Sequence, residues 1–348
     1  KTMAHISAHA HRKDEHVFLA EKNYPQTQNN DFDQVRFIHQ SLPEIAVDEV
    51  DLTTNFAGQK IPFPFYINAM TGGSPRTQRL NQQLATLAKR FSLPMATGSQ
   101  SVALKEPATA GSFQIVRQTN PHGMILANLG ADATVTQAQQ AIAMLKADAL
   151  QIHLNLPQEI VMPEGQRRFY WLANLAKLKT TLPVPVIVKE VGFGMSQETL
   201  QQLKNIGIEH VDLGGRGGTN FVTIENQRRR FKEFNYLKNW GQSPVESLLE
   251  SRAMQADLNI YASGGVRQPL DIIKALALGA QAVGVSGTIL HSLQKNGLDA
   301  TSQLLQAWCQ QLKLLMALLG CRQVKALTHC QLIFSPELMN YIHQRHIK

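Results

Sequence analysis

Three short glycine-bearing segments, each beside an apolar run of strand length, give the clearest chemical signal in this sequence. They are 214–220 (GGRGGTN), 262–267 (ASGGVR) and 284–287 (GVSG). In the last turns of a (β/α)8 barrel, loop amides and a helix N-terminus commonly bind phosphate. The segments therefore predict a phosphorylated cofactor or substrate.

A second group of polar residues lies in and after the apolar run 149–154. Gln151, His153 and Asn155 alternate, so all three point to the same side, which in a barrel strand can be the lumen. A single histidine there is more often a core residue, but Asn155 beside it and Gln158 and Glu159 beyond it favour ligand binding. Imidazole and amide donors near one carboxylate suit a diphosphate that shares its charge with Mg²⁺, which predicts Glu159 as the metal ligand.

Lys189 follows the apolar run 184–188 directly. An ammonium group in such a place costs several kcal/mol unless water or an anion receives it. Two ordinary solutions are an extended side chain that reaches solvent and a pair with Glu190. The third is a cation at a barrel mouth that stabilises an anionic cofactor or intermediate, such as a reduced flavin.

The elements that must position these residues repeat along the chain. Apolar runs of strand length alternate with segments of helical period, which indicates a parallel sheet. The eight predicted strands are 65–67, 95–97, 124–128, 149–154, 186–189, 210–213, 260–263 and 282–285. Eight strand–helix repeats favour a closed α/β TIM barrel over an open doubly wound sheet. We expect one domain, 1–348, whose polar residues 1–60 form an N-terminal extension.

Polar or glycine residues follow the apolar part of every predicted strand. They are 70–73, 98–100, Asn128, 153–155, 189–190, 218–219, 264–265 and 286–287. In a barrel these positions converge at the C-terminal mouth, where active sites form.

Local signals also define several helices. Ser243 is suited to an N-cap, with Pro244 at the first helical position and Glu246 three residues after the cap. Helices 197–205 and 269–278 are predicted to end before Gly207 and Gly279.

Composition limits the protein class. The 348 residues are 43% hydrophobic, and no apolar stretch approaches the ~20 residues that span a bilayer. The chain begins with polar residues, so we expect a cytoplasmic protein without a membrane segment. Cys309, Cys321 and Cys330 include no Cys-x-x-Cys pair, so neither a disulfide framework nor a thiolate metal site is indicated, and helix or core positions are expected.

The formal net charge of +8 is compatible with nucleic acid, with a polyanionic small substrate, or with an ordinary basic surface. Arg228-Arg229-Arg230 is the longest basic run. The charged cluster 11–16, taken alone, is typical of a solvated face or a disordered arm. The long segment 219–243 carries five aromatic residues among basic ones and fits either a lid or a subunit interface.

Over nearly its whole length the sequence resembles the type 2 isopentenyl diphosphate isomerase family, flavin-dependent enzymes with a (β/α)8 barrel. The specific matches are Arg12-Lys13-Asp14-Glu15-His16 and His153-Leu154-Asn155-Leu156-Pro157-Gln158-Glu159. The segments 69–73, 98–100 and 189–194 and the three glycine segments also match. Two positions depart from the family pattern: Gly214 replaces a hydroxyl residue found in some relatives, and Phe221 replaces a common tryptophan.

The resemblance implies a reversible 1,3-allylic proton shift between isopentenyl and dimethylallyl diphosphate on reduced FMN, which acts as acid and base, in isoprenoid biosynthesis. It implies NADPH as reductant, Mg²⁺ on Glu159, and a homo-oligomer, in the family a homotetramer. The expected partner is the small-molecule diphosphate substrate. Binding to nucleic acid or to a membrane is not expected.

Residue roles follow from the matching positions. The implied FMN ligands are Ala69, Met70, Thr71, Ser99, Asn128, Lys189, Thr219, Gly264, Gly265, Arg267, Ser286 and Gly287. The implied substrate ligands are Arg12, Lys13, Ser99, His153, Asn155 and Gln158. Gln158, His153 and Lys189 are the implied catalytic residues. Because the family uses its N-terminal basic pair on the diphosphate, the resemblance replaces the disordered-arm interpretation of Arg12 and Lys13.

Three rival functions remain for comparison. An FMN-dependent α-hydroxy-acid oxidase needs a histidine base in the loop after the sixth strand, where this chain has Gly214-Gly215-Arg216-Gly217-Gly218 and His210 lies upstream. An inosine monophosphate type dehydrogenase needs a loop cysteine, and none precedes Cys309. A nucleic-acid-binding or flavin-storage protein would need clustered basic and aromatic residues, for which 228–240 is the candidate.

Overall fold

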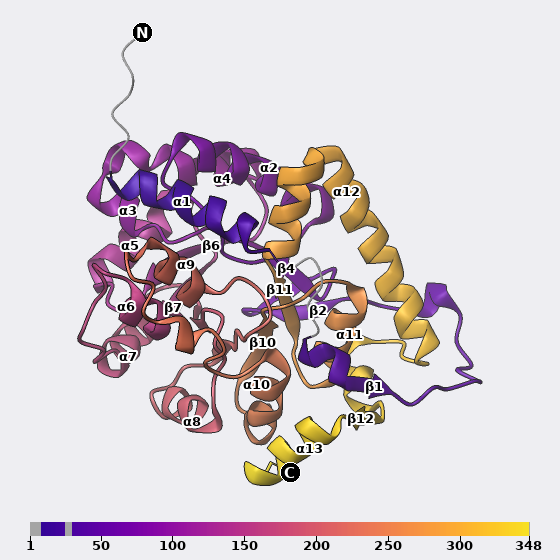
Figure 1. Cartoon of the computed structure of the whole chain (residues 1–348). Helices are drawn as coiled ribbons and strands as arrows, with labels where there is room; N and C mark the ends of the chain where they lie inside the picture. The colour runs from indigo at the N-terminus through magenta and orange to yellow at the C-terminus, as the bar shows by residue number, and fades with distance from the viewer. Residues whose placement is uncertain (1–7, 25–29, 348) are drawn as a thin grey trace.

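The protein is built around a closed barrel of eight parallel strands, in the order β10-β11-β4-β5-β6-β7-β8-β9 (Figure 1). The computed structural model describes residues 8–24 and 30–347. The strands are β4 (Phe65–Ile67), β5 (Met95–Ala96), β6 (Ile125–Gly130), β7 (Ala149–Leu154), β8 (Val186–Glu190), β9 (His210–Asp212), β10 (Asn259–Ser263) and β11 (Ala282–Val285). All eight predicted strands are present, and the predicted (β/α)8 class is confirmed.

Helices surround the barrel and connect its strands (Figure 1). They are α2 (Pro75–Phe91), α3 (Ser101–Lys105), α4 (Gly111–Thr119), α5 (Val135–Leu145), α6 (Leu156–Val161), α7 (Leu172–Thr181), α8 (Gln197–Asn205), α9 (Phe221–Arg228), α10 (Pro244–Ser251), α11 (Pro269–Ala277), α12 (Gly287–Leu318) and α13 (Pro336–Gln344). Short 3-10 helices are η1 (Asp31–Gln34), η2 (Val47–Glu49), η3 (Pro107–Thr109), η4 (Asn235–Leu237), η5 (Arg252–Met254) and η6 (Val324–His329). Within the described chain, no helix is long and apolar enough to cross a membrane.

The predicted local helix signals are confirmed. The Ser243 side chain accepts from the N–H of Glu246, and the carboxylate of Glu246 accepts the N–H of Ser243 in return, forming a capping box. Helix α8 has the predicted bounds, and α11 ends one residue earlier than predicted. Gly207 and Gly279, which follow them, have φ of +81° and +105°, values that favour glycine.

The polar N-terminal region contains structure that its sequence pattern did not reveal. Strands β2 (Thr54–Phe56) and β3 (Gln59–Ile61) form an antiparallel hairpin. Phe56 is fully buried, with its ring centroid 4.5 Å from that of Tyr66 and 4.6 Å from that of Tyr261. The hairpin therefore closes the N-terminal end of the barrel, opposite the predicted mouth.

The two ends of the chain are joined by a second small sheet. Strand β1 (Val35–Phe37) pairs antiparallel with β12 (Leu332–Phe334). Cys321 and Cys330 lie on either side of η6 with their sulfur atoms 3.5 Å apart, and all three cysteines are free. Cys309 and Cys321 are buried, as predicted, whereas Cys330 is partly exposed.

Helix α1 (Ala8–Lys22) lies across one end of the barrel, beside α9 (Figure 1). It contains the whole charged cluster 11–16, which, taken alone, indicated a solvated face or a disordered arm. That interpretation is wrong for Lys13, which is half-buried, and for the acidic residues Asp14 and Glu15, which bond to other elements, as described below.

Candidate functional site

A cavity of about 700 Å³ lies at the C-terminal mouth of the barrel. It is lined by all 18 predicted site residues, although their distances along the chain reach 275 residues, from Arg12 to Gly287. The fold therefore brings the predicted site residues together at one cavity. Whether each residue binds the ligand assigned to it stays a prediction.

One wall of the cavity is backbone rather than side chain. A Cβ atom added to Gly264 would lie 2.3 Å from the carbonyl oxygen of Gly215, and one on Gly215 would lie 2.3 Å from the nitrogen of Pro244. Both glycines have positive φ, +98° and +141°. Only glycine allows the loops after β9 and β10 to approach this closely, which leaves backbone polar groups at the surface of the cavity.

Thr71, which lines the same cavity, has a polar atom without a hydrogen-bond partner among the described residues. That atom is the buried oxygen of the Thr71 hydroxyl. A buried polar atom without a partner is costly, so this hydroxyl is suited to a ligand.

Arg267 is already occupied by protein carboxylates in this structure. Its two terminal nitrogens bond to Asp33 at 2.9 and 2.7 Å, and its Nε bonds to Asp271 at 3.1 Å. These carboxylates raise the pKa of Arg267. The side chain lines the cavity, but its charge is largely balanced by η1 and α11.

Lys189 does not pair with the Glu190 carboxylate. Its Nζ donates to the backbone oxygen of Glu190 at 3.1 Å, while the Glu190 carboxylate accepts the N–H groups of Phe193 at 2.5 Å and Gly194 at 2.9 Å. Successive side chains of β8 point to opposite faces, which separates the two charges. Lys189 is buried and lines the cavity, so among the three alternatives the geometry favours a cation that faces a ligand.

His153 and the start of α6 line the cavity next to Lys189, because β7 pairs with β8 and His153 is the register partner of Lys189. His153 lies in β7, where its Nδ1 is 2.9 Å from Oδ1 of Asn128. Burial, with the positive charges of Lys189 and Lys13, lowers the pKa of His153 to about 3. The free site therefore holds a neutral imidazole at neutral pH.

Glu159 is held in place by its neighbours. Asn155 Nδ2 donates to one carboxylate oxygen at 3.0 Å, and the backbone N–H of Gln166 donates to the other at 2.7 Å. Within the described residues, no three His, Cys, Asp or Glu side chains gather as a metal site. Glu159 is thus a single oriented carboxylate at the rim of the cavity.

The N-terminal helix brings positive charge to this rim. Lys13 is half-buried, and its desolvation together with the charge of Arg12 lowers its pKa to about 8. Asp14 accepts from the Ser74 hydroxyl at 2.5 Å, and Arg12 bonds to Glu164 at 3.2 Å. These bonds place Arg12 and Lys13 at the cavity instead of in solvent.

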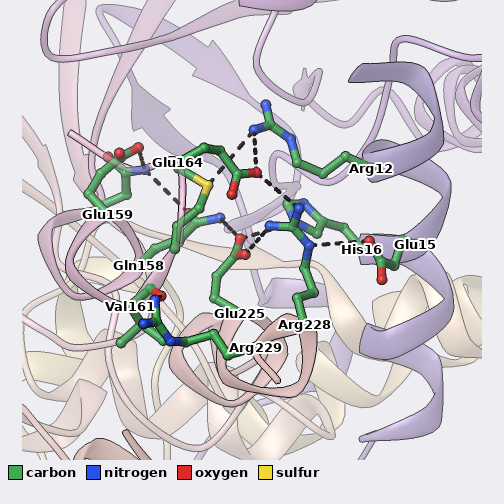
Figure 2. Close-up of polar contacts among 12 residues, drawn as sticks. Arg12, Glu15, His16, Gln158, Glu159, Val161, Glu164, Glu225, Arg228 and Arg229 are labelled. Carbon is green, nitrogen blue, oxygen red and sulfur yellow. Dashed lines mark hydrogen bonds and ion pairs between the residues drawn. The ribbon is translucent and has the colours of Figure 1, made fainter. Parts of the chain in front are cut away.

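Glu225 is an important residue that the sequence analysis missed. Its carboxylate, fully buried, contacts His16 at 3.0 Å, Gln158 at 2.8 Å and Arg228 at 2.5 Å (Figure 2). Although burial acts to raise it, contacts with His16, Gln158 and Arg228 lower the pKa of Glu225 to about 2. The sequence feature that could have pointed to Glu225 is that it is the one charged residue in the otherwise neutral stretch 221–227.

The longest basic run is largely used inside the protein. Arg228 bonds to Glu15, Glu164 and Glu225, and Arg229 bonds to the backbone oxygen of Val161 (Figure 2). Arg229 also bonds to Glu233. The segment 228–240 therefore presents fewer available cations than its sequence indicated. Its exposed aromatics, Phe231, Tyr236 and Trp240, leave the lid and interface alternatives open.

The chain is similar to flavin enzymes and, more closely, to isomerases. A family model described as FMN-dependent dehydrogenase matches residues 114–333. The isopentenyl-diphosphate delta-isomerase of Latilactobacillus sakei subsp. sakei is 56% identical over 341 residues, covering 98% of each chain. The protein of the same name from Staphylococcus haemolyticus is 50% identical over 337 residues, covering 96% of each.

Solved structures share the fold at low identity. A flavocytochrome b2 mutant with benzoylformate has a TM-score of 0.67 at 18% identity, covering 92% of this chain and 82% of that one. A mandelate oxidase mutant with a monooxide FMN adduct has a TM-score of 0.63 at 17% identity, covering 92% of each. These likenesses establish the barrel fold and carry no argument about substrate.

Proposed function

The chain belongs to the isopentenyl-diphosphate delta-isomerase family, in its FMN-dependent type 2 branch, and from this we propose that it interconverts isopentenyl and dimethylallyl diphosphate. The observation that supports this most strongly is the meeting of the two specific motifs, 12–16 and 153–159, at one cavity that also contains the glycine loops. We further propose a role in isoprenoid biosynthesis in the cytoplasm, as a homo-oligomer, with NADPH as reductant.

The cavity suits FMN. The close glycine backbones of 214–218 and 264–265 and the start of α12 at Ser286 and Gly287 fit a phosphate, and the Thr71 hydroxyl supplies an unused polar atom. Ala69, Met70, Ser99, Asn128, Lys189 and Thr219 line the rest of the proposed FMN site. When bound and reduced, FMN supplies the acid and base for the proton shift at carbon.

The residues of the chain itself bind and orient the substrate. Arg12 and Lys13 carry the positive charge for the diphosphate, with Ser99, His153, Asn155 and Gln158 around it. Glu159 would hold Mg²⁺, which prefers one or two carboxylates together with phosphate oxygens and water. Clamping the diphosphate aligns the short hydrocarbon chain and converts remote binding energy into correct placement.

Two side chains act closer to the reacting carbons in this proposal. The buried Lys189 cation favours negative charge on the cofactor. Gln158, whose Nε2 donates to Glu225, presents an oriented amide.

An α-hydroxy-acid oxidase activity is less well supported. The loop 214–218 contains no histidine. His210 lies in β9, and its Nδ1 is 2.9 Å from the hydroxyl of Tyr261, whose oxygen also accepts the N–H of Ala57 at the closed end of the barrel. This histidine is therefore far from the mouth where a base would have to act.

The proposal is tested by anaerobic incubation with isopentenyl diphosphate, FMN, NADPH and Mg²⁺ in D₂O. Product and deuterium incorporation are followed by NMR, with oxidised flavin as the control. Deuterated dimethylallyl diphosphate formed only under reduction supports the isomerase. Bound flavin without any product contradicts it, and consumption of a 2-hydroxy acid would then support the oxidase.

A further inference from the structure

A continuous chain of hydrogen-bonded side chains runs through the barrel lumen to His153, beneath the proposed ligand site. It begins at Asp212, the last residue of β9, which is fully buried. The Asp212 carboxylate accepts from Tyr66 Oη at 2.8 Å, Asn68 Nδ2 at 2.7 Å and Ser263 Oγ at 2.6 Å. Nothing in the proposed function uses Asp212.

Asn68 has a fixed amide orientation because both of its ends are constrained. A carboxylate accepts hydrogen bonds, so the Asn68 atom that faces Asp212 is the nitrogen. The backbone N–H of Ala69 can only donate, and it bonds to Oδ1 of Asn68 at 2.8 Å. The Asn68 oxygen therefore also faces Gln151, whose Nε2 donates to it at 3.0 Å.

The orientation of the Asn68 amide fixes the orientation of the next two amide groups, those of Gln151 and Asn128. With its nitrogen toward Asn68, Gln151 presents Oε1 to Asn128, whose Nδ2 donates to it at 3.2 Å. Asn128 then presents Oδ1 to His153 Nδ1, at 2.9 Å. An amide oxygen has no hydrogen to donate, so the shared proton belongs to Nδ1 of His153.

We propose that Asp212 and Asn68, acting through Gln151 and Asn128, hold His153 in its Nδ1–H tautomer, so that a neutral ring presents the Nε2 lone pair to the cavity. Asn68, Gln151 and Asp212 are positioning residues in this scheme, since they act on the ligand through His153. The low pKa of His153 agrees with a neutral ring in the free site.

The tautomer matters for the ligand, a step that rests on the proposed function. Among the described residues, Nε2 of His153 has no hydrogen-bond partner, and the ring lines the cavity. A diphosphate oxygen needs a donor, whereas Nε2 of the neutral ring is an acceptor. A direct bond between them therefore requires one more proton, which arrives with the substrate or from solvent as the negative charge enters beside Lys13, Lys189 and His153.

The first test is spectroscopic and needs no turnover. The full chain with FMN is prepared with histidine carrying ¹⁵N at Nδ1 alone, and solid-state ¹⁵N spectra are recorded at pH 7. The His153→Gln spectrum identifies the His153 signal among the 12 histidines. The expected signal is a protonated Nδ1 in a neutral ring. An unprotonated Nδ1 overturns the proposal, whether or not the protein is an isomerase.

A matched pair of variants tests the chain of amides. Gln151→Leu removes the link between Asn68 and Asn128, so Asn128 is free to turn and a signal from unprotonated Nδ1 is expected. Gln100 is equally buried and bonds to the backbone N–H of Asn128 instead of its side chain, so Gln100→Leu should leave the tautomer unchanged.

Gln151→Glu keeps an oxygen toward Asn128 and should preserve the protonated Nδ1. The proposed role of the hydrogen-bonded amides is contradicted if the His153 signal is unchanged in Gln151→Leu. It is also contradicted if Gln151→Leu and Gln100→Leu change the signal equally. If Gln151→Leu does not fold, the spectrum of the unaltered protein still decides the tautomer.

Discussion

Nε2 of His16 lies 3.0 Å from Oε1 of Glu225, so the N-terminal helix is tied to α9 across the mouth of the barrel. The same carboxylate bonds to Gln158 of the proposed substrate site. Closure of the mouth by α1 and the position of Gln158 therefore depend on one buried acid.

Glu225 should make stability depend on acid pH. Its pKa falls from an ordinary value of about 4.3 in the unfolded chain to about 2 in the folded protein. The unfolded state then binds more protons between these values, so the contribution is complete above about pH 4.3 and is lost as pH falls toward 2. Glu225→Gln should lower Tm strongly at pH 7 and much less at pH 3.

Thermal unfolding followed by circular dichroism measures this difference. Glu44→Gln, which changes an exposed carboxylate, is the control and should shift Tm little at either pH. An equal loss of Tm at pH 7 and pH 3 in Glu225→Gln would show that the low pKa does not stabilise the fold.

Lys189 should favour the reduced cofactor. Lys189→Met removes the buried cation, and a charge-assisted contact of roughly 1.5–3 kcal/mol corresponds to about 30–65 mV for a two-electron couple. The flavin midpoint potential should therefore become more negative by that amount, measured by anaerobic dye titration. Lys189→Arg should retain most of the wild-type potential, and Lys177→Met, at an exposed position of α7, should not change it. An unchanged flavin potential in Lys189→Met would contradict the proposal that the Lys189 cation stabilises the reduced cofactor.

Glu159 should set the response to Mg²⁺. Glu159→Gln keeps the shape of the side chain but loses the negative charge, so the Mg²⁺ concentration for half-maximal activity should rise roughly 10- to 100-fold. Steady-state assays over a Mg²⁺ series measure it. Glu164 is a nearby carboxylate that is paired with Arg12 and Arg228, so Glu164→Gln should leave this concentration nearly unchanged. A similar rise in both variants would count against a specific metal ligand.

Phe56 should support the barrel from its closed end. Phe56→Ala leaves a cavity between Tyr66 and Tyr261 and should cost about 3–5 kcal/mol of unfolding free energy, measured by denaturant titration. Because the hairpin lies opposite the mouth, turnover per bound flavin should change little below the unfolding transition. Leu42→Ala, at a side chain that is 81% exposed, should cost less than about 0.5 kcal/mol. A loss below 1 kcal/mol in Phe56→Ala would show that the hairpin does not brace the barrel.

The sequence by itself determined the features that depend on neighbouring residues. Strand and helix periods, the Ser243 cap and the glycine endings are local, so eight strands and the bounds of α8 followed from the pattern. Because every parallel strand of a barrel ends at the same mouth, polar residues after the strands, such as His153 and Lys189, had to meet in one cavity.

Only the tertiary structure decided which charges face each other. The cluster 11–16 resembles a solvated arm when taken alone, because the groups that bond to Asp14 and Glu15, Ser74 and Arg228, are 60 and 213 residues away. Arg267 likewise meets Asp33 from a distant segment, and Glu225 gains its neighbours only when α1, α6 and α9 pack together. The pKa of a buried group depends on such neighbours and on exclusion of water, and neither is a property of the local sequence.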